Sequence, residues 1–366
     1  MARMLYIVRH AQPDFGQRGP RCIGRRTDLP LSGRGVRQAR DLSEFFADKN
    51  ISCVYHSGLK RSSETAHIIA DGKYPVKACE DLAELEMGLW DGLTYDDIRQ
   101  KYPDDHNRRS KEIAHTPPPG GESFMQGLSR FSSAVKSITD RAYENVVIVA
   151  HAGVNRIFLC DALGMDHNNV LFLPQPYGCV NSLQVKENGF ILETHGVMPF
   201  PAPDEDECLY ILEQHKTPLN IIDHCKAVSR KAEQIACSLD PNYRIDHGLV
   251  KSAALLHDIY RQKKYHSQAG ANLLFQLGYP QVAAIIRSHH HLPEEDLTHI
   301  TERTIVYYAD KLIDGVEEVT LERRFSVSLD KCLTSQARAS HQLKYAQALR
   351  AQALIHDCVL RATSRK

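Results

Sequence analysis

The distribution of strand-forming segments constrains this chain more than any other feature of its sequence. In the first half, short apolar runs of β type alternate with helical periodicity, which is typical of an α/β fold with a mostly parallel sheet flanked by helices. We expect strands at 4–8, 53–56 and 145–150 and helices at 33–49 and 60–70.

The Pro-rich, acidic segment 198–207 (MPFPAPDEDE) ends this alternation. Beyond it only helical patterns remain, and we expect helices at 220–238, 247–260, 269–277, 280–288 and 302–317. The sequence therefore predicts an α/β domain over 1–197, a linker at 198–207 and an all-α domain over 208–366.

The composition excludes several classes of protein. The 366 residues, 42% of them apolar, suffice for two globular domains of roughly 150 residues each. The 45 basic and 45 acidic residues cancel, which argues against a nucleic-acid partner. We expect a cytoplasmic protein with no membrane partner, because no apolar stretch reaches the roughly 18 residues of a membrane helix and the N-terminus lacks a secretory pattern. The 10 cysteines are scattered without a CxxC pair, which favours reduced thiols.

Charged and imidazole side chains of the first half follow strand ends. Arg9 and His10 come directly after the first expected strand, and His151 comes directly after the strand 145–150. Because parallel strands end at the same edge of a sheet, we expect His10 and His151 to converge there, joined by Arg61 and Glu84. Guanidinium groups suit phosphoryl oxygens, and a neutral imidazole can attack phosphorus, so the set predicts a phosphoryl-transfer site.

Over roughly residues 1–195 the chain resembles the histidine phosphatase superfamily, which also includes the cofactor-dependent phosphoglycerate mutases. The matching motifs stand in the family's order at 9–10, 24–25, 28–32, 35, 38–39, 57–62, 64–66, 84–92, 120–123 and 149–153. The resemblance implies that His10 is the nucleophile that becomes a phosphohistidine and that Glu84 donates a proton to the leaving oxygen. The residues implied to bind the phosphoryl group are Arg9, Arg61 and His151, the last also counted as catalytic. No metal or cofactor is implied here, because cationic side chains neutralise the transferred group.

Some assignments in this half stay open. The family usually continues after Arg-His with Gly and a Glu-Thr pair and then an Asn that touches phosphate, whereas residues 11–14 here read Ala-Gln-Pro-Asp. Asp14 is a poor substitute near an anion, so one phosphate contact is unassigned. Glu86 rivals Glu84 as the acid, although Glu84 keeps the family's spacing of four residues before Gly88. Arg25 either reaches the substrate or is a solvated loop charge.

The run 23–35 (IGRRTDLPLSGRG) most resembles α-ribazole phosphatases of the cobalamin pathway. Mutases of the family carry additional segments that close over a bisphosphate, and this half has little room for them. A phosphatase is therefore favoured over a mutase.

The helical half carries a second set of chemically active side chains, on or beside apolar helical patterns. Neutral imidazoles and carboxylates are ligands of Mn²⁺, Fe²⁺, Ni²⁺ or Zn²⁺, and helices can project them into the centre of a bundle. The apolar run 253–256 directly precedes His257-Asp258, so we expect this pair to be buried. The predicted ligands of one or two divalent ions are His224, His257, Asp258, His266, His289 and Asp310.

From about residue 217 to 320 the chain resembles the HD-domain metal-dependent phosphohydrolases. The family's order His, His-Asp, Asp is matched by His224, His257-Asp258 and Asp310, and the additional histidines resemble the subgroup that binds two metals, which includes bacterial diadenosine tetraphosphate hydrolases. Adjacent helical positions point about 100° apart, so of His289 and His290 we expect only His289 to face the metals unless the helix ends there.

Other residues of this half are predicted to stay outside the metal site. His356-Asp357 has no partner histidine 33 residues upstream, which is the spacing of His224 from His257, and no later aspartate corresponding to Asp310. We therefore expect a structural or surface pair there. The histidines expected to be solvated are His247, His291 and His299. Lys311 could steady a phosphate or only solvate a helix face.

Together the two sites predict a bifunctional phosphohydrolase that acts on small phosphorylated substrates. One half would be a metal-independent phosphomonoesterase, and the other would hydrolyse a phosphorylated small molecule or nucleotide with a metal. A phosphoglycerate mutase would instead move the phosphate to a second hydroxyl. A nucleotide-sensing HD domain would bind its ligand without hydrolysis, but the complete ligand set argues against that alternative.

Overall fold

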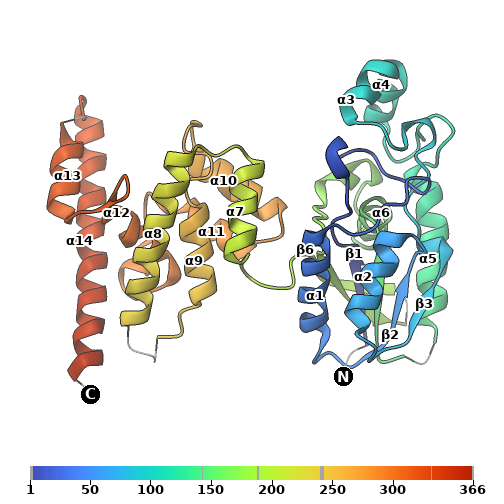
Figure 1. The fold of residues 1–366 in the computed structure, drawn as a ribbon, viewed down its shortest axis with the longest axis horizontal. Coiled ribbons are helices and arrows are strands. Elements are labelled where there is room, and N and C mark those ends of the chain that lie inside the picture. Colours follow the sequence, from blue (N-terminus) through green and yellow to red (C-terminus); the bar gives the residue numbers. More distant parts are fainter. Residues whose placement is uncertain (1–2, 142, 188, 240–242, 331, 365–366) are drawn as a thin grey trace. The chain divides into compact units, whose positions relative to one another are not determined.

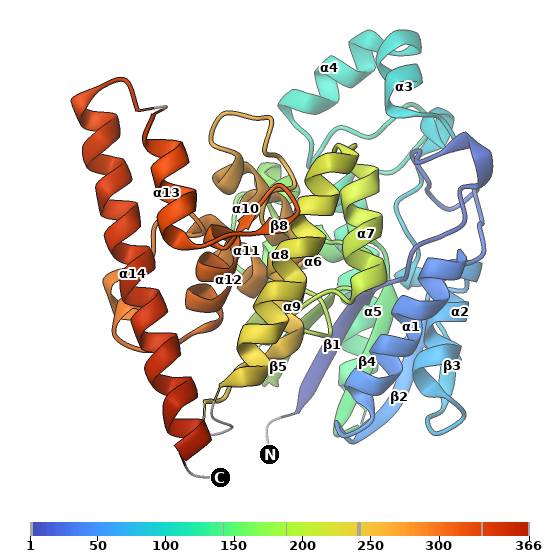
Figure 2. The same cartoon turned by 60° about the vertical axis from the view of Figure 1, so that its left-hand side comes forward.

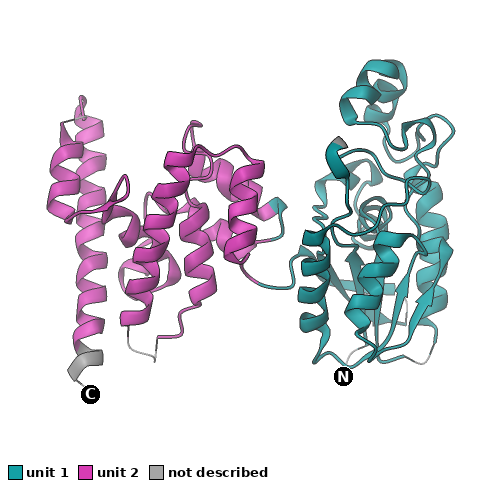
Figure 3. Ribbon diagram, viewed as in Figure 1, with its two compact units in different colours: residues 1–200, 276–278 teal, residues 201–275, 279–366 magenta. Residues whose placement is uncertain are grey.

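The computed structural model describes residues 3–141, 143–187, 189–239, 243–330 and 332–364. The chain divides into two compact units, an α/β unit of residues 1–200 with 276–278 and a helical unit of residues 201–275 with 279–366 (Figure 3). No helix of the described residues combines the length and the apolar character needed to cross a membrane.

A six-stranded sheet in the order β3-β2-β4-β1-β5-β6 forms the centre of the α/β unit (Figure 1). The first four strands of the chain pair in parallel, and β5 and β6 join one edge as antiparallel strands. The sheet is therefore mostly parallel, which confirms the predicted fold class. The strands are β1 (Met4–Arg9), β2 (Ile51–His56), β3 (Val76–Ala78), β4 (Asn145–Ala150), β5 (Val180–Lys186) and β6 (Gly189–Val197).

Helices cover both faces of this sheet because strand side chains alternate between the faces. Leu5 and Ile7 of β1 join a core with α5 (Phe124–Thr139) and α6 (Ala152–Ala162), whereas Tyr6 and Val8 join a core with α1 (Gly33–Phe46) and α2 (Lys60–Ala70). Two short helices, α3 (Tyr95–Lys101) and α4 (Pro103–Lys111), follow one another in the connection between β3 and α5.

The register of the parallel strands fixes where the polar residues emerge. Arg9 at the end of β1 pairs with Ala150 at the end of β4, and His56 at the end of β2 pairs with Val149. The residues that directly follow these strands therefore meet at one edge of the sheet.

The helical unit contains eight α-helices among the described residues. They are α7 (Glu205–Gln214), α8 (Leu219–Ser238), α9 (His247–Leu256), α10 (His266–Gln276), α11 (Pro280–Arg287), α12 (Glu302–Lys311), α13 (Leu321–Leu329) and α14 (Ser335–Ser364). Helices α13 and α14 pack against each other (Figure 2).

Some boundaries differ from those expected. Helix α7 begins at Glu205, inside the segment 198–207 expected as a linker. The helix expected over 302–317 ends at Lys311 and leads into a two-stranded ladder of β7 (Ile313–Asp314) and β8 (Glu317–Glu318), because Gly315 takes a left-handed conformation with φ of 61° that turns the chain back.

Candidate phosphoryl-transfer site and metal centre

His10 and His151 converge at the carboxyl edge of the sheet. Their ring centroids lie 5.0 Å apart, and both side chains are buried, His10 being 2% and His151 0% exposed. The parallel pairing of β1 with β4 produces this approach, as expected from the positions of the two residues after their strands.

His10 is oriented as a nucleophile. Its Nδ1 lies 2.8 Å from the carbonyl oxygen of Ala11, which can only accept a hydrogen bond, so Nδ1 carries the proton and Nε2 keeps its lone pair. Burial, followed by the nearby Arg61 and Arg9 guanidinium groups, holds the pKa of His10 well below its usual range. The imidazole is therefore neutral at neutral pH, which is the form that can attack phosphorus.

His151 is held by a residue from a third strand end. Its Nε2 lies 2.8 Å from the hydroxyl oxygen of Ser57, which comes directly after β2. Its Nδ1 is buried and has no hydrogen-bond partner among the described residues. Burial, followed by the positive charge of Arg61, keeps the pKa of His151 well below the usual value, so this ring is also neutral at neutral pH.

Arg9 and Arg61 provide positive charge beside the two rings. The Arg61 side chain is fully buried and donates hydrogen bonds to the carbonyls of Thr27 (3.0 Å) and Gly24 (2.9 Å). Its Nε, like that of Arg9, is buried without a partner in the described chain. Donors left unpaired beside a neutral imidazole fit a bound anion.

The carboxylate of Glu84 is fixed against the beginning of α6. It accepts hydrogen bonds from the backbone N–H groups of Leu85 (2.9 Å), Gly153 (2.9 Å) and Val154 (3.2 Å). A Cβ atom at position 153 would lie 2.6 Å from Glu84 Oε1, which explains the glycine there. These hydrogen bonds hold Glu84 against the helix that starts after His151.

A cavity of about 540 Å³ opens onto this site. Arg9, His10 and Glu84 line it, together with apolar side chains such as Trp90 and Phe124. Arg109 also lines the cavity and is 7% exposed; burial lowers its pKa to about 10, and its guanidinium carbon lies 5.2 Å from the ring centroid of Phe124. The cavity therefore suits a phosphomonoester whose organic part is partly apolar.

The structure places the alternative residues away from the reacting position. Glu86 forms an ion pair with Arg26 at 3.1 Å and does not line the cavity. Arg25 donates to the carbonyl of Glu84 at 2.9 Å, so it supports the backbone next to the site. Asp14 is exposed and accepts a hydrogen bond from the backbone N–H of Gly16 at 2.8 Å. We therefore do not assign the missing phosphate contact to Asp14.

Two residues near the site were not predicted. Ser57 follows β2, so the same edge argument that selected His10 and His151 would have found it. Tyr177 lies in the connection before β5, with its ring centroid 5.6 Å from that of His10 and 3.6 Å from the guanidinium carbon of Arg9. No local sequence pattern marks Tyr177.

The helical unit gathers the predicted metal ligands from five helices or their ends. His224 lies on α8, the pair His257-Asp258 follows α9, His266 begins α10, His289 follows α11 and Asp310 lies on α12. The carboxylates lie among the rings: His224 Nε2 is 3.3 Å from Asp310 Oδ1, and His266 Nε2 is 3.3 Å from Asp258 Oδ1. The chain thus brings all six predicted ligands together.

The hydrogen bonds of three rings fix which nitrogen faces this cluster. The Nδ1 atoms of His224, His257 and His289 lie 2.8, 2.8 and 2.6 Å from the backbone carbonyls of Gly315, Ala254 and Ile286. Carbonyls only accept, so each Nδ1 donates, and in the neutral ring Nε2 presents a lone pair. All three Nε2 atoms are buried without a hydrogen-bond partner in the described residues.

Lone pairs that face carboxylates are stabilised by a positive charge between them. A divalent cation satisfies orphaned imidazole nitrogens and the two aspartates at once, so the side chains fit a metal. Burial alone would raise the pKa of Asp310, but Lys311 and the imidazoles of His224 and His257 hold it well below the usual range, in the ionised form that a ligand needs.

Asp258 lies between two groups of imidazoles. Its Oδ2 is 3.8 Å from His224 Nε2 and 3.5 Å from His257 Nε2, whereas its Oδ1 is 3.3 Å from His266 Nε2 and 3.6 Å from His289 Nε2. Each oxygen faces a different pair of rings, so both oxygens of Asp258 are placed where they could act as metal ligands.

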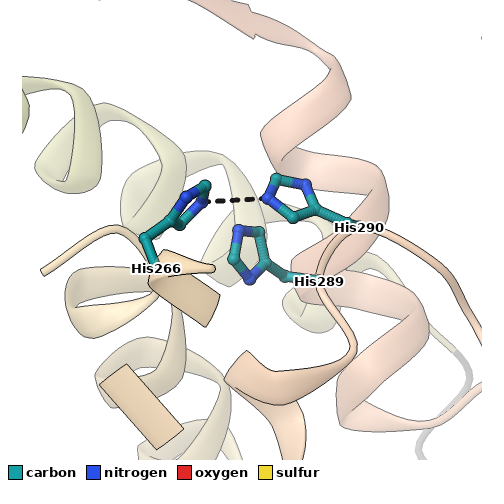
Figure 4. Close-up of side chains that lie close together, drawn as sticks. All are labelled: His266, His289 and His290. Atoms are coloured by element: carbon teal, nitrogen blue, oxygen red, sulfur yellow. Dashed lines mark hydrogen bonds between the residues drawn. The ribbon is translucent and has the colours of Figure 1, made fainter. Parts of the chain in front are cut away.

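His290 also belongs to the cluster, although only His289 was expected to face it. The Nε2 atoms of His266 and His290 are 2.9 Å apart, and His266, His289 and His290 form one group of candidate ligands (Figure 4). Helix α11 ends at Arg287, so the two adjacent histidines lie in the following turn, where their ring centroids are 4.0 Å apart. His290 was expected to point away from the metals only if the helix continued through it, and the helix does not continue.

The residues expected outside the metal site lie on the surface. His356 and Asp357 on α14 are exposed, as are His247, His291 and His299. Lys311, in contrast, is only 8% exposed; its ammonium donates to Asp310 Oδ2 at 2.5 Å and to the carbonyl of His289 at 3.3 Å. It is therefore part of the cluster's surroundings and does not solvate a helix face.

Each half of the chain matches a known protein family. The histidine phosphatase superfamily (branch 1) profile matches residues 5–197, and the HD domain profile matches residues 221–314. Phosphoserine phosphatase 1 of Hydrogenobacter thermophilus is 31% identical over 183 residues, which cover 49% of this chain and 82% of that protein. Adenosylcobalamin/alpha-ribazole phosphatase of Escherichia coli is 23% identical over 185 residues, which cover 50% of this chain and 90% of that protein.

A solved structure named mycobacterial hydrolase 1 shares the fold of the first half. It is 25% identical, with a TM-score of 0.50 over 54% of this chain and 100% of that chain. The resemblances to the histidine phosphatase superfamily, to α-ribazole phosphatases and to HD domains are thus confirmed. Since the superfamily profile spans more than half of the sequence, the chain belongs to the histidine phosphatase superfamily (branch 1) and is a phosphatase that carries an HD domain in its C-terminal half.

Proposed function

We propose that the chain is a bifunctional phosphohydrolase with one metal-independent and one metal-dependent site. For the α/β unit, the observation that carries the proposal is the orientation of His10, whose Nδ1 is tied to Ala11 while Nε2 is free to react beside Arg9 and Arg61. The substrate class is a phosphomonoester of a small organic molecule, for which the adjoining cavity of about 540 Å³ has room.

The reaction in this unit proceeds in two displacements. His10 Nε2 forms a bond to phosphorus while the ester P–O bond breaks, and Glu84 supplies the proton that the leaving oxygen takes up. Arg9, Arg61 and His151 stabilise the negative charge on the transferred group. Water then attacks the phosphohistidine and gives a proton back to Glu84, the P–N bond breaks, and inorganic phosphate and free His10 are released.

The helical unit is proposed to hydrolyse a second phosphorylated small molecule or nucleotide. His224, His257, Asp258, His266, His289 and Asp310 would hold one or two divalent transition-metal ions, with His290 as a further ligand from the same cluster. Bound ions of this type lower the pKa of water and clamp a phosphate for in-line attack. The backbone carbonyls that accept from His224, His257 and His289 orient the rings, and Lys311 lies next to Asp310, where it can bind a phosphate oxygen.

One experiment on the full chain tests both parts. The substrates are phosphoserine and α-ribazole phosphate, since two relatives are a phosphoserine phosphatase and an α-ribazole phosphatase, and a panel of nucleotides. Each is assayed with and without EDTA. The proteins compared are the parent and the His10→Ala and Asp258→Ala variants. We expect one activity that resists EDTA and requires His10, and a second that EDTA and Asp258→Ala both remove. A single activity lost in both variants would contradict two independent sites, and phosphate recovered on a second hydroxyl would show a mutase instead of a phosphatase.

We also propose that the protein is located in the cytoplasm. The cysteines of the described residues are all free, which agrees with a reducing compartment.

A further inference from the structure

The connection that leads into β5 is bonded to the backbone of the residues that follow β1. The backbone N–H of Gly178 lies 3.2 Å from the carbonyl oxygen of Arg9 and 3.4 Å from that of His10, and the N–H of Arg9 donates to the carbonyl of Cys179 at 3.1 Å. Gly178 takes a left-handed conformation with φ of 77°, which turns the chain at this point. The residues just before Gly178 are therefore held close to the nucleophile.

Gln175 anchors this connection through a buried network of amides. Its side chain is 2% exposed, its Nε2 donates to Asn181 Oδ1 at 2.7 Å, and its Oε1 accepts from Asn155 Nδ2 at 3.2 Å and from Asn181 Nδ2 at 3.1 Å. The backbone carbonyl of Gln175 accepts a hydrogen bond from Arg9 Nη1 at 2.5 Å. Buried polar groups that are well paired favour one arrangement, so this carbonyl is a fixed acceptor for Arg9.

The ring of Tyr177 provides the second contact of the Arg9 guanidinium. A single hydrogen bond sets the distance between Nη1 and Gln175, but it lets the guanidinium swing about that bond. The centroid of the Tyr177 ring lies 3.6 Å from the guanidinium carbon, so the face of the ring restricts this swing. The contact is a cation–π attraction and uses no N–H donor. Tyr177 also lines the cavity, with its ring centroid 5.6 Å from that of His10.

Arg61, the other guanidinium beside His10, is held in a different way. It is fully buried and donates to two backbone carbonyls, those of Thr27 and Gly24. The Arg9 side chain donates to one carbonyl of the described residues, and its Nε is buried without a partner among them. Arg9 therefore keeps more of its donors for an anion, and a contact that leaves those donors free is the kind that can hold it in place.

We propose that Tyr177 is a positioning residue of the phosphoryl-transfer site, whose ring holds the Arg9 guanidinium beside His10 and leaves the N–H groups of Arg9 to bind phosphoryl oxygens. The inference rests on the phosphatase site proposed for the α/β unit. Because Arg9 is ordered before the anion enters, less of the interaction free energy is lost on binding.

A double-mutant cycle tests whether Tyr177 acts through Arg9. Inorganic phosphate is titrated calorimetrically into the full chain, with EDTA in cell and syringe so that the helical unit holds no metal ions. The four proteins of the cycle are the parent, Tyr177→Ala, Arg9→Met and the double variant. For the same proteins, kcat and KM are measured for p-nitrophenyl phosphate in EDTA.

We expect Tyr177→Ala to weaken phosphate binding by about tenfold, the size of a partly desolvated cation–π contact. In the Arg9→Met background the same substitution should change the affinity less than about twofold, because residues that act through one contact are not additive. Tyr177→Phe should bind phosphate as the parent does, since it keeps the ring. Tyr177→Leu keeps bulk without an aromatic face, and it tests the same expectation should Tyr177→Ala fail to fold.

Tyr143→Ala is the matched control. Tyr143 is a partly exposed tyrosine of the same unit with the ammonium of Lys77 5.7 Å from its ring centroid, but it does not line the cavity. Its phosphate affinity should equal that of the parent. Thermal unfolding of each variant shows whether it is folded.

The failures of the two proposals can be told apart. A parent that binds phosphate overturns the role of Tyr177 alone if Tyr177→Ala and Tyr177→Leu cause no loss, if the loss is the same in the Arg9→Met background, or if Tyr177→Phe loses as much as Tyr177→Ala. A parent that binds no phosphate in EDTA overturns the phosphoryl-transfer site and the inference that depends on it.

Discussion

The carboxylate of Glu84 accepts a hydrogen bond from the backbone N–H of Gly153 at 2.9 Å, so the proposed proton donor is attached to the first turn of the helix that follows His151. The same carboxylate accepts from Val154 at 3.2 Å. The acid and the two histidines are therefore positioned by one helix start and two strand ends, which restricts their relative movement. This relationship makes the role of Glu84 testable by substitution.

Replacing Glu84 with glutamine is expected to slow the hydrolysis of alkyl phosphates by about 10²-fold or more. Substrates with good leaving groups should be affected much less, because an acid matters most when the departing oxygen is basic. The measurement compares kcat/KM for an alkyl phosphate and for p-nitrophenyl phosphate. Glu86→Gln is the control, since Glu86 pairs with Arg26 and does not line the cavity. Equal losses on both substrate types in Glu84→Gln would assign the proton to Glu86 or to water.

His10→Ala is expected to abolish the EDTA-resistant activity, because it removes the imidazole that lines the cavity beside Arg9 and Arg61 and holds its Nε2 free to react. In the parent, rapid acid-free quenching should trap phosphate on His10 as an acid-labile adduct, detected by mass spectrometry of the peptide that contains it. His56→Ala is a matched control, since His56 is a buried strand-end histidine that does not line the cavity. Full activity in the His10→Ala protein would refute the assignment.

The pH dependence of the EDTA-resistant activity should reflect the neutral form of His10. Burial and the charges of Arg61 and Arg9 lower its pKa, so protonation removes the nucleophile only when the pH falls well below 6.5. We expect kcat/KM to hold from neutral pH down past 6.5 and to decline below that. Arg61→Met removes one positive charge, and its acid limb should move to higher pH. An acid limb at or above pH 6.5 in the parent would show that these charges do not act on His10 in the working enzyme.

The metal content of two aspartate variants tests whether the metal site includes His257-Asp258 or His356-Asp357. Purified parent protein should carry one or two transition-metal ions per chain. Asp258→Ala should lose them, because both oxygens of Asp258 face imidazoles and even the loss of residues that only support ligands commonly costs 10- to 100-fold in affinity. Asp357→Ala should retain them, because Asp357 is exposed on α14. Elemental analysis decides the matter, and the opposite pattern would move the metal site to the C-terminal helix.

The arrangement of β1, β4 and the residues after them follows from the sequence alone. Apolar runs of β type that alternate with helical patterns specify a parallel sheet, and parallel strands place their ends together, so His10 and His151 could be paired without coordinates. The exclusion of His356-Asp357 also needed only spacing, because a metal site requires partners that this pair lacks. These properties are encoded within short segments or in their order.

Other features depended on where the chain turns. His290 joins the cluster because α11 ends at Arg287, and helix ends are set by tertiary packing as much as by local preference. Tyr177 reaches Arg9 from a connection without a repeating pattern, and Glu84 is distinguished from Glu86 by the N–H groups of a helix distant in sequence.

Sequence by itself therefore determined the two fold classes, the order of the motifs and most of the residues brought into each site. Tertiary structure alone decided the orientation of each ring and the position of Asp258 between two pairs of imidazoles. The physical reason is range: strand and helix periodicity depends on neighbours a few residues apart, whereas the direction of a side chain in a site depends on hydrogen bonds and packing between segments that are far apart in the chain.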